Sequence, residues 1–214
     1  MSKLTIENIS AGYGSVQVLQ DVNLEVRSGE TVVLLGTNGN GKSTLLKSVM
    51  GLITPTQGNI NLEIDGQNTN LIGKGTEEIV SMGVSMVPEG RRLFSLLSVE
   101  ENLTLGAYRN EARQKINENL EFCFTTFPRL KDRRKQQAGS LSGGEQQMVA
   151  VARSLMCDPS ILLIDEPSVG LAPILVSQMI AKIKELKEEK NLTVLMAEQN
   201  FNQAIKIADR GYII

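Results

Sequence analysis

The stretch that decides the fold is GTNGNGKST, residues 36–44. It matches the pattern G-x-x-x-x-G-K-S/T, in which a strand runs through a glycine-rich loop into a helix. The apolar run 32–35 precedes it, and apolar residues recur at helical spacing from Leu46 to Ile53. Glycines let the backbone N–H groups of such a loop surround phosphate oxygens at the positive end of the helix. The sequence therefore predicts a nucleoside triphosphate site on an α/β fold.

Two positions of this loop have side-chain roles that the pattern predicts. Lys42 would reach the β- and γ-phosphates, and the Ser43 hydroxyl would bind Mg²⁺. The alternative, a glycine-rich turn with an incidental lysine, does not explain why strand, motif and helix occur in this order. The predicted nucleotide contacts in the loop are Gly36, Thr37, Asn38, Gly39, Asn40, Gly41, Lys42, Ser43 and Thr44.

A second apolar run, 161–164, ends in the adjacent carboxylates Asp165 and Glu166. Consecutive residues of a strand point to opposite faces, so the two acids are predicted to have different roles. Asp165 would hold Mg²⁺ through water, and Glu166 would orient and deprotonate an attacking water. An acid beside the metal-binding acid favours hydrolysis over phosphoryl transfer to a second substrate.

Two hydrophobic patterns predict the fold class. One is the alternation of apolar and polar residues that half-buried antiparallel strands show, and the other is a continuous apolar run, typical of a parallel sheet covered on both faces. Alternation occurs at 4–9, 22–26 and 60–66, and continuous runs at 32–35, 84–87, 161–164 and 194–197. We expect a P-loop NTPase (RecA-like) α/β core with an antiparallel β-subdomain and an inserted helical subdomain. Within one domain, 1–214, the core would comprise 1–90 and 158–214, and the helical lobe 91–157.

Composition narrows the possible partners. The 214 residues are 41 % hydrophobic and 21 % charged with a net charge of −2, so bulk charge indicates neither a nucleic-acid binder nor a membrane-surface binder. No N-terminal stretch resembles a signal peptide, and no run approaches the roughly 20 apolar residues of a spanning helix. Work at a membrane would therefore require a partner. Cys123 and Cys157 are expected to be reduced, buried thiols of a cytosolic protein.

The stretch LSGGEQQMVAVARSLMCDP, residues 141–159, resembles the signature region of the ATP-binding subunits of ABC transporters. The resemblance covers essentially the whole chain. It implies that the signature faces the γ-phosphate of an ATP held by a second such subunit. ATP would then join two domains head to tail, as a homodimer or a heterodimer. The implied nucleotide contacts in the signature are Ser142, Gly143, Gly144 and Glu145.

Other positions match landmarks of the same family. Tyr13 corresponds to the aromatic residue that stacks on adenine, and Glu89 stands in the loop joining core to helical lobe, where most members carry glutamine. Ala172 replaces an aspartate with which many relatives link the two sites. The chain stops at Ile214 in a strand that relatives would continue, so the C-terminal segment is expected to be trimmed.

The stretch LMAEQN, residues 195–200, would end in a γ-phosphate-contacting histidine in most relatives, at the position of Gln199. The chain contains no histidine. Glutamine can donate a neutral N–H to a phosphate oxygen or to the attacking water, but it cannot titrate near neutral pH. The predicted catalytic residues are therefore Glu166 and Gln199, with Gln199 positioning rather than carrying a proton.

The motifs PEGRR, LSGGEQQM, DEPSVGLAP and AEQN together resemble the importer ATPases for branched-chain amino acids. This implies an ATP- and Mg²⁺-dependent ATPase, cytoplasmic and peripheral on the inner face of the cell membrane. Its partners would be a second ATPase subunit, membrane permeases docked near residues 89–102 and, indirectly, a solute-binding protein.

Several alternatives stay open. They are an importer of urea or short amides, an exporter of lipid or lipopolysaccharide, and, least favoured, a DNA-repair ATPase of the ABC type. The last would carry long coiled coils, and no sustained heptad run occurs here, so no nucleic-acid partner is expected. A P-loop kinase or a GTPase would leave residues 141–145 unexplained.

Overall fold

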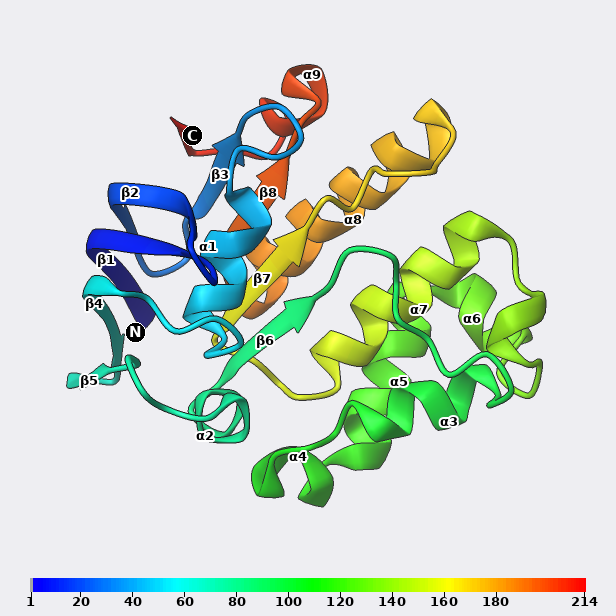
Figure 1. Ribbon diagram of the computed structural model, residues 1–214. Helices are drawn as coiled ribbons and strands as arrows, with labels where there is room; N and C mark the ends of the chain where they lie inside the picture. The colour runs from blue at the N-terminus through cyan, green and yellow to red at the C-terminus, as the bar shows by residue number, and fades with distance from the viewer. Residues whose placement is uncertain (1) are drawn as a thin grey trace.

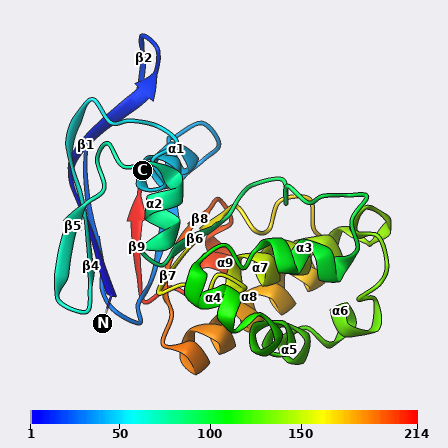
Figure 2. The same cartoon turned by 90° about the horizontal axis from the view of Figure 1, so that it is seen from below.

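The computed structural model describes residues 2–214 and contains two β-sheets and a group of helices (Figure 1). One sheet is antiparallel with the strand order β2-β1-β4-β5, and the other is parallel with the order β6-β7-β8-β3-β9. Seen from below, the antiparallel sheet lies to one side of the parallel sheet and the helical group lies to the other (Figure 2). The expected α/β class with an antiparallel subdomain is confirmed.

The antiparallel sheet contains all three predicted alternating strands. It consists of β1 (Ser2–Tyr13), β2 (Val16–Val26), β4 (Gln57–Ile64) and β5 (Gln67–Asn70). β1 runs further than the alternation indicates because its register shifts near Asn8, whose φ is 51°. Beyond that bulge Ile9, Ser10 and Ala11 are all buried, so the period of two is lost.

The parallel sheet is made of the four continuous apolar runs and one further edge strand. Its strands are β3 (Thr31–Leu35), β6 (Val84–Val87), β7 (Ile161–Asp165), β8 (Thr193–Glu198) and β9 (Arg210–Ile213). In β3, β6, β7 and β8, neighbouring residues enter two different hydrophobic clusters. In β7, Leu163 packs toward the antiparallel sheet, whereas Leu162 and Ile164 pack on the opposite side. Burial on both faces explains why these strands show no alternation.

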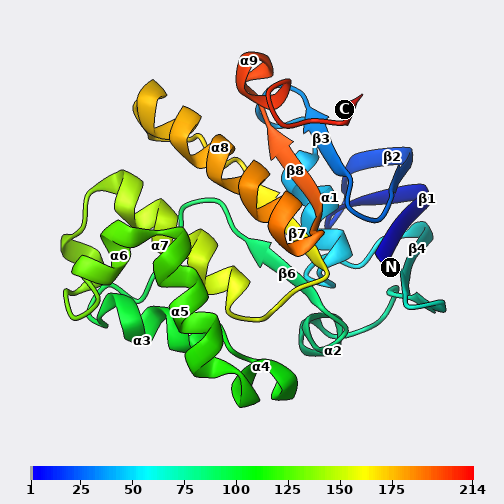
Figure 3. The same cartoon turned by 180° about the vertical axis from the view of Figure 1, so that it is seen from behind.

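Helices cover both faces of the parallel sheet. On the side of the antiparallel sheet lie α1 (Lys42–Val49) and α2 (Thr76–Ser81). On the other face lies α8 (Pro173–Lys190), which is in front when the molecule is seen from behind (Figure 3). Its apolar stripe from Val176 to Ile183 is buried, as the helical spacing predicts. The short helix α9 (Phe201–Ala204) joins β8 to β9.

The remaining helices form one group between β6 and β7 in the chain. They are α3 (Val99–Leu105), α4 (Asn110–Gln114), α5 (Ile116–Thr126), α6 (Pro128–Asp132), a 3₁₀ turn (Ala138–Ser140) and α7 (Gly143–Leu155). Their apolar side chains share one hydrophobic cluster with the parallel sheet and α8. The division of the chain at residues 91 and 157 therefore stays a prediction.

Both cysteines are free, buried thiols. Burial raises the pKa of Cys123 to about 12, and burial also raises the pKa of Cys157. Because the thiolate is the reactive form, neither side chain is suited to redox or nucleophilic chemistry near neutral pH. Across residues 2–214 no helix has the length and apolar composition needed to cross a bilayer.

Candidate active site

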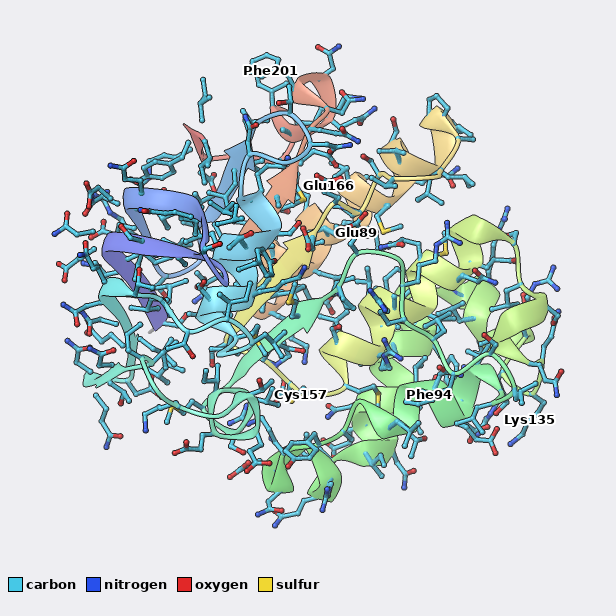
Figure 4. All side chains as sticks on the ribbon, in the orientation of Figure 1. Glu89, Phe94, Lys135, Cys157, Glu166 and Phe201 are labelled. Carbon is cyan, nitrogen blue, oxygen red and sulfur yellow. The ribbon has the colours of Figure 1, made fainter. Side chains whose placement is uncertain are left out.

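The candidate site lies where the carboxyl ends of the parallel strands meet. β3 leads into the phosphate loop, β7 ends at Asp165, and β8 ends at Glu198 next to Gln199. The register pairs Leu35 with Glu198 and Asp165 with Ala197, so the three strand ends are adjacent. Glu89, which follows β6, lies near Glu166 at the same edge (Figure 4). In open parallel sheets this edge is where ligands bind.

The phosphate loop depends on two glycines with positive φ. Gly39 and Gly41 have φ values of 89° and 92°, a region that side chains rarely adopt. A Cβ on Gly41 would also lie 2.6 Å from Leu19 Cδ2 of β2, so a larger residue would displace this buried leucine. Gly41 begins α1 without any side-chain cap, which leaves the first N–H groups of the helix available to an anion. Residues 37–40 are exposed, as a phosphate-binding loop requires.

Lys42 forms a buried ion pair with Glu166. Its Nζ is 3.2 Å from Glu166 Oε1 and donates hydrogen bonds of 2.9 Å to the carbonyl oxygens of Gly36 and Thr37. Glu166 follows β7 with a φ of 45°, held by a hydrogen bond from its N–H to Ala197 O. A non-glycine residue in this region costs about 1–3 kcal/mol and persists because the surrounding structure holds it in place. Glu166 is thus oriented toward the lysine that is predicted to bind phosphate.

Ser43 and Asp165 are also in contact. Ser43 Oγ donates a 2.7 Å hydrogen bond to Asp165 Oδ1. Burial raises the pKa of the Asp165 carboxyl, and the nearby carboxylates of Glu89 and Glu166 add to this effect. A hydroxyl and a carboxylate are oxygen ligands that suit Mg²⁺, which usually takes one or two protein ligands and completes its shell with water and substrate phosphates. Within the described residues no group of three His, Cys, Asp or Glu side chains forms a metal cage.

Three predicted residues are exposed around this edge. Gln199 lies just beyond β8, and Glu89 lies just beyond β6. Tyr13 ends β1 with half of its surface exposed. The hairpin that carries Tyr13 reaches the phosphate loop through β2, since Leu19 lies against Gly41. These positions are compatible with contacts to a nucleotide, and the individual roles remain predictions.

The signature residues form the start of α7. Ser142 is its N-cap: Ser142 Oγ accepts a hydrogen bond from the N–H of Glu145, while Glu145 Oε2 accepts from the backbone N–H and the hydroxyl of Ser142. The Ser142 hydrogen bond holds the pKa of the Glu145 carboxyl below its usual value, and Arg133 adds an ion pair of 2.7 Å. The side chain of Glu145 therefore orders its own helix. Within one chain this helix start stands apart from the phosphate loop (Figure 1).

Arg91 lies in the region 89–102 that is expected to contact a permease, but its bonds within the chain carry no sequence signal. Arg91 Nη1 donates a 2.9 Å hydrogen bond to Gln146 Oε1 of α7. Arg91 and Arg92 are consecutive residues with positive φ, and Arg153 donates hydrogen bonds to both of their carbonyl oxygens. Together these bonds tie the loop after β6 to the signature helix. Glu198 of the LMAEQN stretch also bonds within the chain, to Ser168 and to the backbone of Gln199 and Asn200.

Comparisons with known proteins identify the family of the chain. The family model described as "ABC transporter" matches residues 19–169. The chain is 45 % identical to BraG of Pseudomonas aeruginosa, a high-affinity branched-chain amino acid transport ATP-binding protein, over 99 % of this chain and 88 % of BraG. It is 34 % identical to a probable branched-chain amino acid transport ATP-binding protein, LivF, of Archaeoglobus fulgidus, over 96 % of this chain and 85 % of LivF. It is 35 % identical to LptB of Haemophilus influenzae, a lipopolysaccharide export ATP-binding protein, over 100 % of this chain and 87 % of LptB.

Solved structures show the same relationship. A nucleotide-free ATP-binding cassette from an ABC transporter superposes with a TM-score of 0.85 at 26 % identity, covering 100 % of this chain and 88 % of that one. The ATP-binding subunit of another ABC transporter superposes with a TM-score of 0.83 at 30 % identity, covering 99 % of this chain and 85 % of that one. Taken with the phosphate loop, the acidic strand end and the signature helix, these matches show that the chain belongs to the ABC transporter family and is one of its ATP-hydrolysing, ATP-binding subunits.

Proposed function

We propose that this chain powers the import of branched-chain amino acids. The observation that carries the choice of solute is the 45 % identity to BraG along almost the full length of both chains. The export protein LptB is also similar over the whole chain, at 35 % identity, so lipopolysaccharide export is the second candidate. A urea or amide importer remains a further variant of the first proposal.

The contacts of the site support a specific division of roles. Lys42, now bonded to Glu166 and to the carbonyl oxygens of Gly36 and Thr37, would exchange these partners for the β- and γ-phosphates, which offer its positive charge stronger attraction. Glu166 would then be free to take a proton from the attacking water. Ser43 and Asp165 would hold Mg²⁺, which supplies charge neutralisation at the phosphates when bound. Gln199 would donate its side-chain N–H to the γ-phosphate or to the water.

The arrangement also supports a second ATPase subunit. Residues 142–145 stand apart from residues 36–44 of the same chain, so a signature facing the γ-phosphate would come from another copy or from a sister subunit. The subunit would sit peripherally at the inner face of the cell membrane through permeases that receive solute from a binding protein. Closure of the two subunits around ATP would drive the permeases, since ATP binds the closed state more tightly than the open one.

An exposed apolar area on the helical side suits permease docking. Phe94, Leu96 and Leu105 are exposed, and Leu96 is 83 % exposed. Leu105 is part of an open groove of about 600 Å³, and Leu96 directly precedes Leu97 of the same groove. The groove is lined by Leu97, Ser98, Glu100, Glu101, Thr104, Leu105 and Lys135. Phe94 and Lys135 mark this side of the molecule (Figure 4). The groove overlaps residues 89–102, the region expected to contact a permease.

We expect Leu96→Glu to weaken permease binding by about tenfold or more, because a charge would replace the most exposed apolar side chain of the proposed docking area. The measurement is co-purification with, and affinity for, the permease pair in detergent. Leu52→Glu is the matched control. Leu52 is likewise an exposed leucine, with 60 % of its surface accessible, but it follows α1 and lies outside the groove. Equal permease affinity of wild type and Leu96→Glu would contradict the docking site. Arg91 and Leu93 are poorer probes because Arg91 bonds to Gln146 and Leu93 packs against the core.

The solute is tested by transport in proteoliposomes. Permeases, a branched-chain amino acid binding protein and a sister ATPase would be reconstituted with this chain. ATP-dependent uptake of labelled leucine, and little uptake of urea, is the expected result. A transporter in which leucine leaves ATP turnover and uptake unchanged would refute the proposal for this solute. ATP turnover stimulated by lipopolysaccharide-export subunits instead would favour the second candidate.

A further inference from the structure

Glu198 is a fully buried carboxylate at the centre of the site edge. It is the last residue of β8, the strand between β7 and β3, and it is 0 % exposed. Glu198 Oε1 accepts three hydrogen bonds: from the N–H of Gln199 at 2.8 Å, from the N–H of Asn200 at 2.9 Å and from Ser168 Oγ at 2.9 Å. One oxygen atom therefore fixes the backbone on which Gln199 is mounted.

The second oxygen of the same carboxylate makes no polar contact among the described residues. Glu198 Oε2 is buried and, within residues 2–214, has no hydrogen-bond partner. A buried, unpaired carboxylate oxygen is costly, and native proteins seldom keep one without a reason. An apolar residue at this strand end would avoid that cost, but it would leave two backbone N–H groups and a hydroxyl without their acceptor. Accepting the three hydrogen bonds at Oε1 is therefore what a carboxylate contributes at this position.

These bonds connect two segments that carry chemistry. Ser168 lies in the loop that follows Glu166, and this loop continues to Ala172 at the start of α8. Gln199 stands on the other segment, beyond β8. The chain has alanine where an aspartate could link the loop to a neighbouring site. The hydrogen bond between Ser168 and Glu198 supplies a direct link from that loop to Gln199 within one chain.

We propose that Glu198 is a positioning residue that holds Gln199 toward the γ-phosphate and couples it to the loop after Glu166 through Ser168. This inference rests on the proposed role of Gln199 in ATP hydrolysis. If the loop moved when two subunits close, the displacement of Ser168 would shift Glu198 Oε1, and with it the backbone of Gln199. Glu198 itself touches neither nucleotide nor water in this role.

A purely structural role would have different consequences. If Glu198 only completed the turn into α9, its loss would destabilise the domain and its effect on hydrolysis would add to that of any other substitution. A positioning role through Gln199 makes the two effects overlap, because Glu198 has nothing left to position once the Gln199 side chain is removed. Overlap of effects therefore separates the two explanations.

The experiment compares Glu198→Ala, Glu198→Gln, Gln199→Ala and the double variant Glu198→Ala/Gln199→Ala in the assembled transporter. Mg²⁺-dependent ATP hydrolysis is measured together with ATP affinity. Displacement of a reacting group by about 1 Å can cost about 10²-fold in rate, so Glu198→Ala is expected to lower kcat by up to about 10²-fold with little change in ATP affinity. Glu198→Gln should keep most of the rate, since its amide oxygen can accept the same three hydrogen bonds. The double variant should be no slower than the slower single variant.

Hydrogen exchange gives a second readout that does not depend on turnover. In Glu198→Ala the amides of 199–204 and 168–171 should exchange about tenfold faster, as expected for lost hydrogen bonds, while β1 keeps its protection. Full additivity of the Glu198 and Gln199 effects, or equal damage from Glu198→Gln and Glu198→Ala, would overturn the inference. So would a wild-type rate in Glu198→Ala. Absence of Mg²⁺-dependent hydrolysis in the wild-type complex would instead count against the proposed function, and the exchange data would still report on the link.

Discussion

Glu166→Gln is expected to slow ATP hydrolysis by about 10²- to 10⁴-fold, the range of a lost general base, while ATP binding persists. Glutamine has the shape of glutamate but cannot take a proton from water. Lys42 would also lose its charged partner, 3.2 Å away, and would be more available to phosphate oxygens. ATP affinity should therefore stay the same or rise. Single-turnover hydrolysis and equilibrium binding of ATP measure the two effects separately.

Glu63→Gln provides the control, because Glu63 is an exposed residue of β4 outside the site. It should match the wild type in both assays. A Glu166→Gln variant with a wild-type hydrolysis rate would show that another group takes the proton. A variant that no longer binds ATP would instead show that Glu166 orders the phosphate loop.

Lys42→Met is expected to abolish measurable ATP binding and to destabilise the protein at the same time. Lys42 and Glu166 are both buried, with side-chain exposures of 2 % and 8 %. Removing one member of a buried ion pair leaves the other charge uncompensated, which typically costs about 3–5 kcal/mol. The free energy of unfolding from urea titration should fall by that amount. Lys184→Met, at an exposed position of α8, should leave it unchanged.

The double variant Lys42→Met/Glu166→Gln separates the two consequences. Glutamine removes the uncompensated charge, so most of the lost stability should return. ATP binding should stay lost, because the cation that reaches the phosphates is still missing. If stability does not return, the destabilisation comes from the lost hydrogen bonds to Gly36 and Thr37 rather than from the charge on Glu166.

The hydrophobic patterns of the sequence made both sheets predictable. Continuous apolar runs such as 161–164 indicate strands covered on both faces, and those strands are adjacent and parallel. β5 could not be predicted, because Gln67–Asn70 contains no apolar residue and forms a largely exposed edge strand. The full length of β1 was equally hidden, since a bulge at Asn8 shifts the register and ends the alternation. Edge strands and bulges leave little hydrophobic signal.

Motif spacing names the site residues but not their partners. The phosphate-loop pattern points to Lys42, whereas its contact with Glu166 depends on how β3 and β7 are arranged in the sheet. The bonds of Arg91 to α7 and of Glu198 to Ser168 likewise join segments far apart in the chain. A sequence pattern records local spacing, so contacts of this kind become visible only once the strands are placed next to each other.

The parallel sheet separates two hydrophobic clusters, and the site stands along their boundary. The phosphate loop rests on Leu19 of β2, which belongs to the cluster shared with the antiparallel sheet. The helices α7 and α8 belong to the cluster on the opposite face of the parallel sheet. Interiors are close-packed, so a change of side-chain volume is felt first by the side chains packed against it. The packing beneath the phosphate loop can therefore stay constant while the packing beneath the signature helix and α8 changes. Such a division would let relatives change partners while keeping one nucleotide chemistry.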